Sequence, residues 1–120
     1  MTSSVDSASR KPHYTVKNVE NVLAAPTIQA RIFALVPGDS IPWHHHREIT
    51  DHYFVLRGTL IVKTRDSADE YQLETGEHHR IVPGTSHHLS NRGAADCQFL
   101  LLQGEGKYDW VKDEAMPSED

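Results

Sequence analysis

The chain has 120 residues, an apolar fraction of 38% and a formal net charge of −5 at pH 7. This length suits one domain with a single packed core. Because the balance is acidic and Lys and Arg are not clustered, we expect no nucleic-acid partner. No apolar run approaches the roughly 20 residues needed to cross a bilayer, so we expect no membrane partner either.

The cysteine count and the first residues bear on the compartment. Cys97 is the only cysteine, so no intrachain disulfide is possible, and a reducing compartment is the simplest interpretation. The first residues, MTSSVDSASRKPH, contain no apolar stretch resembling a signal peptide. The sequence therefore predicts a soluble, cytoplasmic protein.

The two ends differ in composition from the middle of the chain. Residues 1–13 are Ser-rich and polar, which predicts a flexible N-terminal arm. Residues 112–120 form an acidic C-terminal tail. A single domain is expected over residues 14–111.

Short strands between turn signals are expected throughout the middle of the chain. In residues 27–36, TIQARIFALV, alternation sets Gln29 and Arg31 on the same face as Phe33, and the strand ends at the Pro37-Gly38 turn. Residues 14–16 form a short extended piece, and residues 18–23 fit a strand or a single helical turn. Further strands are expected at residues 41–46, 51–57, 59–64, 70–73, 78–82, 87–91 and 96–103. This pattern is typical of an all-β sandwich or barrel, and closure is favoured because an open sheet exposes its edges.

Possible metal ligands are concentrated in residues 44–52, which contain His44, His45, His46, Asp51 and His52. Imidazoles beside a carboxylate make a mixed nitrogen and oxygen site suited to a divalent metal. Residues two apart in a strand share a face with Cα atoms roughly 6.6 Å apart, so His44 and His46 can meet one ion while His45 points away. On the next strand Asp51 shares its face with Tyr53, and His52 has the opposite parity. The later pair His87-His88 can supply a third imidazole.

Two motifs in this order resemble those of the cupin family. The first is Gly38, five residues, His44, one residue, His46, four residues, Asp51, six residues and Gly58. The second is Gly76, five residues, Val82-Pro83-Gly84, two residues, His87, three residues and Asn91. The resemblance implies a small double-stranded β-helix (jelly-roll) barrel, often dimeric. It also implies one divalent metal held by His44, His46, Asp51 and His87.

The sequence departs from the family pattern at two positions. Val82 stands where the family usually has proline, although Pro83 still stiffens the turn. Asp51 stands where the family usually has glutamate, and its side chain is shorter by roughly 1.5 Å. Asp51 could therefore bind the metal directly, bind it through water, or orient an imidazole. His52 could replace it only if a bulge turned the strand.

Several other side chains have two interpretations. Tyr53 is the candidate catalytic residue, as a proton donor or acceptor or as a hydrogen-bond donor to a metal-bound ligand, with core packing as the alternative. Gln29 and Arg31 could hold an anionic substrate inside the barrel, or lie at an edge or on the surface. Cys97 is expected to be a small buried apolar residue.

A metal bound by three imidazoles and a carboxylate keeps about two or three coordination positions open. We therefore expect a cofactor of one divalent transition metal (Fe, Mn, Ni, Zn or Cu) in a metal-dependent enzyme that acts on a small oxygen-bearing molecule. The expected chemistry is that of a dioxygenase or of a lyase or isomerase. The alternative is a module that binds or senses a small ligand without turnover. A purely structural metal is disfavoured because such sites close their coordination shell. We also expect a homodimer, because the apolar residues 99–102 need a cover.

Overall fold

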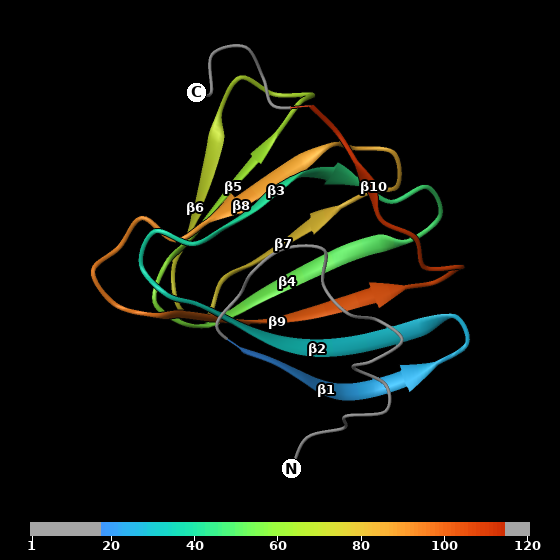
Figure 1. Ribbon diagram of the computed structural model, residues 1–120, viewed down its shortest axis with the longest axis horizontal. Helices are drawn as coiled ribbons and strands as arrows, with labels where there is room; N and C mark the ends of the chain where they lie inside the picture. The colour runs from blue at the N-terminus through green and yellow to red at the C-terminus, as the bar shows by residue number, and fades with distance from the viewer. Residues whose placement is uncertain (1–17, 115–120) are drawn as a thin grey trace.

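The computed structural model describes residues 18–114, which form ten strands in two five-stranded antiparallel sheets (Figure 1). The strands of the first sheet, in spatial order, are β1 (Asn18–Ala25), β2 (Ile28–Leu35), β9 (Cys97–Gly104), β4 (Thr50–Arg57) and β7 (His78–Ile81). Those of the second are β10 (Val111–Lys112), β3 (Ser40–His45), β8 (His87–Ser90), β5 (Leu60–Thr64) and β6 (Glu70–Leu73). The described part of the chain contains no helix, and thus none that could span a membrane. The predicted all-β, double-stranded β-helix barrel is confirmed.

Several sequence-based predictions concern the two ends of the chain, at or beyond the limits of residues 18–114. The arm at 1–13, the extended piece at 14–16 and residues 115–120 of the tail lie outside the described residues. The undecided segment at 18–23 is part of the edge strand β1. β10 was not anticipated, and it pairs with β3 through Val111 and Lys112 across the expected domain boundary.

The two sheets face each other and come together at the left of Figure 1. The space between them at that end is filled by a buried apolar cluster that includes Leu35, Val55 and Phe99. At the opposite ends of the same strands the inward positions are polar, as with Gln29 on β2 and Gln103 on β9. The barrel therefore has an apolar end, which stabilises the fold, and a polar end.

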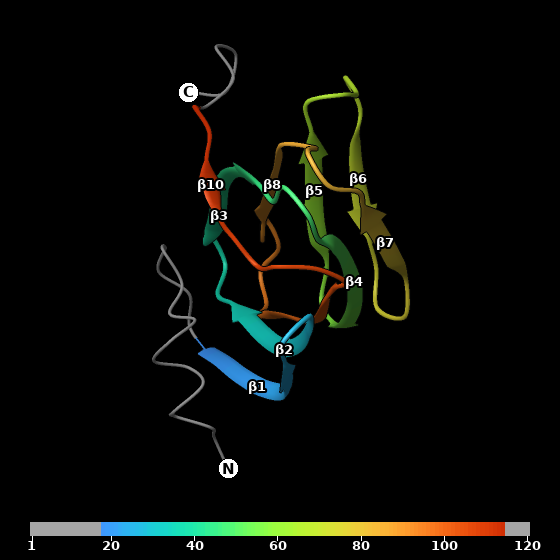
Figure 2. The same cartoon turned by 90° about the vertical axis from the view of Figure 1, so that its right-hand side faces the viewer.

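An aromatic contact joins the two sheets at one edge of the barrel. The rings of Tyr71 on β6 and His79 on β7 lie 4.4 Å apart, and Figure 2 shows these two strands close together at the side of the molecule. Burial lowers the pKa of His79, which is half-buried. His79 thus closes the seam between the sheets and is not a member of the buried cluster.

A register irregularity in β3 decides which side chains enter the barrel. Strict alternation would place Ile41 and His44, three residues apart, on opposite faces. The pairing of β3 with β8 shifts between these two residues, and both are buried, with 1% and 3% exposure. The bulge lets the same strand supply a core residue and a site residue.

Gly58 and Asn91, which belong to the two motifs, have structural roles here. Gly58 has a φ of +77°, and a Cβ on it would lie 2.6 Å from the carbonyl oxygen of Asp96. Asn91 is buried, and its side-chain amide donates to the carbonyls of Leu35 and Ala95, each at 2.9 Å. Both residues fix turns at the apolar end.

Candidate metal centre

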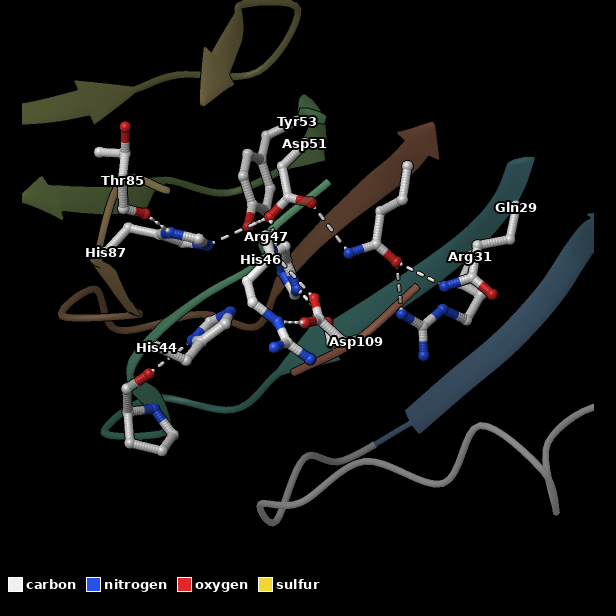
Figure 3. Close-up of polar contacts among 12 residues, drawn as sticks. Gln29, Arg31, His44, His46, Arg47, Asp51, Tyr53, Thr85, His87 and Asp109 are labelled. Carbon is white, nitrogen blue, oxygen red and sulfur yellow. Dashed lines mark hydrogen bonds and ion pairs between the residues drawn. The ribbon is translucent and has the colours of Figure 1, made fainter. Parts of the chain in front are cut away.

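Four side chains from three strands meet at the polar end of the barrel (Figure 3). His44 lies on β3, His46 directly follows it, Asp51 is near the start of β4 and His87 begins β8. Their potential ligand atoms all lie within 4.8 Å of one another, and each residue is at most 3% exposed. The Nε2 atoms of His87 and His46 are 3.1 and 3.3 Å from Oδ2 of Asp51. The cluster can therefore hold a metal ion.

Each histidine of the cluster is oriented by a backbone carbonyl. Nδ1 of His44 donates to the carbonyl of Pro42 at 2.7 Å, and Nδ1 of His87 donates to that of Thr85 at 2.8 Å. Nδ1 of His46 donates to the carbonyl of Asp109, 63 positions away. An imidazole that donates from Nδ1 can present the lone pair of Nε2 to a metal.

The protonation of the cluster depends on burial and on Asp51. Burial, helped by repulsion from His87, lowers the pKa of His44 to about 2, so this ring is neutral. Burial opposes the charge on His46 as well, but contact with Asp51 outweighs it and raises the pKa of His46. Burial would raise the pKa of Asp51, yet its contacts with His46 and His87 hold that pKa well below its usual range. Asp51 is thus an anion.

The donor set fits a divalent metal. Nε2 of His46 is buried and makes no hydrogen bond of good geometry within residues 18–114, so a cation at the centre would supply its missing partner. Neutral imidazoles and an ionised carboxylate are the ligand forms that such a metal requires.

Asp51 is held on both oxygens. The hydroxyl of Tyr53 donates to Oδ2 at 2.7 Å, and the amide of Gln103 donates to Oδ1 at 2.9 Å. The Tyr53 ring itself packs in the core, with its centroid 5.7 Å from that of Phe99. The ring of Tyr53 therefore packs in the core, while its hydroxyl reaches the cluster through Asp51.

The neighbouring histidines lie elsewhere. Nδ1 of His45 is 3.0 Å from a carboxylate oxygen of Asp113 on the outer side of β3. The ring of His88 packs against Trp43 at 5.6 Å. His52 is half-buried and does not belong to the cluster. Strand parity separated these three residues from His44, His46 and His87 correctly.

The segment 105–110, which follows β9, covers the cluster. The Trp110 ring stacks on His44 with centroids 4.8 Å apart, and the Tyr108 ring lies 5.6 Å from that of His46. The carboxylate of Asp109 pairs with the exposed Arg47. This segment lies at the end of the domain expected at residues 14–111, and the sequence alone assigned it no role. Its only sequence signal is the pair of aromatic residues in a polar stretch.

A row of polar side chains leads away from Asp51 along β9 and β2 (Figure 3). Oε1 of Gln103 accepts from Arg31 and from Gln29, each at 2.7 Å. Gln29 and Arg31, whose placement the sequence left open, are inside the barrel with 4% and 3% exposure. Gln103 was missed, although a polar residue in phase with Cys97, Phe99 and Leu101 could have indicated it.

Comparison with known proteins supports the same fold. The chain is 30% identical over 77 residues to the oxalate-binding protein of Thermotoga maritima, and the match covers 62% of each chain. Among solved structures, it resembles the polyketide cyclase RemF from Streptomyces resistomycificus, with a TM-score of 0.75 and 19% identity over 90% of this chain and 78% of that one. It also resembles a Klebsiella pneumoniae protein with a double-stranded β-helix domain, with a TM-score of 0.73 and 18% identity over 89% and 94% of the two chains. Such identities show the fold alone.

The family itself is shown by a match to the profile of the cupin domain. This match covers residues 31–103, which include all four residues of the buried cluster and most of the two sheets. The chain belongs to the cupin family.

Proposed function

We propose that this cupin is a metal-dependent enzyme that acts on a small oxygen-bearing molecule, with His44, His46, Asp51 and His87 as the ligands of one divalent transition metal. The observation that carries the proposal is the convergence of three oriented imidazoles and one carboxylate in a buried space. This donor set suits Fe, Mn, Ni, Zn or Cu.

The proposed chemistry is that of a dioxygenase or of a lyase or isomerase, for which a bound metal supplies a site for dioxygen or acts as a Lewis acid. Four protein ligands leave room for substrate oxygens on a six-coordinate ion. Tyr108 and Trp110 keep water from the site, since their rings lie against the imidazoles. Tyr53 is the candidate for proton transfer, because its hydroxyl holds a proton 2.7 Å from Asp51.

A second candidate function is binding without turnover. It is favoured by the relative named as an oxalate-binding protein, which supports a small carboxylate as the ligand. Incubation of the metal-loaded protein with small carboxylates under air separates the two functions. Products detected by mass spectrometry support the enzyme, whereas a ligand that stabilises the protein and is recovered unchanged supports the binding module.

Metal content is the first test of either function. Protein purified without a metal-affinity column should carry about one transition metal per chain, measured by elemental analysis. After chelation, adding metal at 100 times its dissociation constant should stabilise the fold by about 2.7 kcal/mol, seen as a higher melting temperature. Folded protein that is metal-free as purified and gains no stability from any of the five metals would contradict the proposal.

We also propose a homodimer, formed through the outer face of the first sheet. Ile32, Leu100 and Phe54 are neighbours across β2, β9 and β4, and all three are only half-buried. Light scattering at micromolar concentration should give twice the chain mass, and Leu100→Glu should reduce it to one chain mass because it places a charge in the interface. A monomer mass for the unmodified protein would rule this dimer out.

A further inference from the structure

We propose that Gln29, Arg31 and Gln103 form a subsite that selects a small dicarboxylic acid carrying a hydroxyl group, with one carboxylate at the metal and the other at Arg31. The inference rests on the proposed metal site and adds the class of molecule that enters it.

The first observation is the position of a buried guanidinium beside the cluster. Arg31 is 3% exposed, and its Nη2 donates to Oε1 of Gln103, whose amide nitrogen donates to Asp51. The guanidinium also lies over the rings of Phe33 and Tyr108, at 5.1 and 5.7 Å from their centroids. Aromatic packing and the bond to Gln103 fix its orientation, and a fixed guanidinium binds carboxylates through two parallel hydrogen bonds.

The second observation is an acceptor that requires a donor. Gln29 is 4% exposed, and while its amide nitrogen donates to Gln103, its Oε1 has no hydrogen-bond partner among the described residues. Leaving a buried acceptor unsatisfied costs free energy, so a ligand that brings a donor to this atom is favoured over one that does not. Carboxylates at neutral pH cannot donate, whereas a hydroxyl group can.

The spacing limits the length of the acid. Two hydrogen bonds, of 2.7 and 2.9 Å, and one amide group separate the guanidinium of Arg31 from the carboxylate of Asp51. Such a path is at most roughly 8 Å long, so a short acid of about four carbons can place a carboxylate at each end.

The free space shows what must move to admit the acid. The cavity lined by Gln29, Gln103, Ile49 and Tyr108 measures about 10 Å³, which is room for about one water. An acid at Gln29 therefore requires a lining side chain to move, and Tyr108 is one of the side chains that line this space. Gly106, in the segment 105–110 that carries Tyr108, has a φ of +148°.

The experiment compares malate with succinate, which is the same acid without the hydroxyl group. Calorimetric titration of the metal-loaded protein should show malate binding about tenfold more tightly than succinate. Gln29→Met keeps the side-chain length but removes this acceptor, together with the amide that donates to Gln103, and should abolish the preference for malate over succinate. Gln98→Met, a substitution of the half-buried glutamine on the outer face of β9, is the matched control and should change neither affinity.

Arg31→Lys tests the other end of the acid. Lysine keeps the charge but cannot make two parallel hydrogen bonds, so it should weaken both acids about tenfold and preserve their ratio. Because Arg31 is buried, the melting temperature and metal content of each variant are measured first. The comparison of the two acids on the unmodified protein needs no variant.

The outcomes separate this inference from the proposed function. Three results, each obtained with protein that binds metal, would overturn the hydroxy-acid subsite and leave the metal site standing. They are equal affinities for malate and succinate, no binding of either acid, and equal losses of affinity for both acids in Gln29→Met. Failure to bind any metal overturns both.

Discussion

Replacing His46 or His87 by alanine is expected to lower the affinity for a divalent metal by about 100-fold or more, since each substitution removes one of the four proposed ligands. His45→Ala and His88→Ala should leave the affinity within about twofold, because these side chains contact Asp113 and Trp43 outside the cluster. Competition with a chromogenic chelator measures all four dissociation constants.

The adjacent controls make this experiment specific. Each control removes an imidazole one residue away from the proposed ligand, so the charge and composition of the two variants are alike. Similar losses for His45→Ala and His46→Ala would mean that the metal sits elsewhere. Melting curves of the metal-free variants show whether a loss of affinity reflects a loss of fold.

The metal-free protein is expected to lose stability steeply as the pH falls from 6 to 4. His44, His46 and Asp51 each make the free energy of unfolding depend on pH, and their effects differ in sign. The pKa of His44 drops from 6.5 to about 2 on folding, so its contribution is full above pH 6.5 and is lost progressively as the pH falls toward 2. The pKa of His46 is raised, so its contribution is full below pH 6.5 and is lost as the pH rises through the folded value.

Between pH 6 and pH 4 the effect of His44 dominates. His46 is protonated in both states there, and Asp51, whose pKa is lowered from 3.8, contributes stability that is lost only at lower pH. The unfolded chain takes up a proton at residue 44 that the folded chain excludes, so the slope approaches about 1.4 kcal/mol per pH unit. The lowered pKa of His79 acts in the same direction.

Urea unfolding of chelator-treated protein across this range measures the slope. His44→Gln does not titrate and should remove most of it. Ile61→Val is the control, because shortening this buried side chain should cost about 1 kcal/mol at every pH without changing the slope. A slope that persists in His44→Gln would show that other groups are responsible.

Much of the fold was predictable because its signals are local. Turn residues separate the strands at residues 28–103, and alternation within β4 places Asp51 and Tyr53 on one face. The spacing of His44, His46 and His87 was sufficient to bring them together, since β3 and β8 pair with His44 opposite His87. The shorter Asp51 still reaches the cluster.

What the sequence did not predict depends on contacts between distant residues. Alternation cannot reveal the bulge in β3, which lets Ile41 and His44 share the interior. Gln103 acquires its role only because β9 lies between β2 and β4, opposite both Gln29 and Asp51. The carbonyl of Asp109 orients His46 across 63 positions, and this contact could not be predicted because every residue has a backbone carbonyl.

The place of β9 in its sheet has a consequence for the order in which a newly made chain can assemble. β2 and β4 do not pair with each other, because β9, from much later in the chain, lies between them. The first sheet therefore stays split during synthesis until residues 97–104 have emerged. The acceptor of His46 follows only a few residues later. All four proposed ligands are thus made before β9, and any metal would be captured only after β9 has paired with β2 and β4.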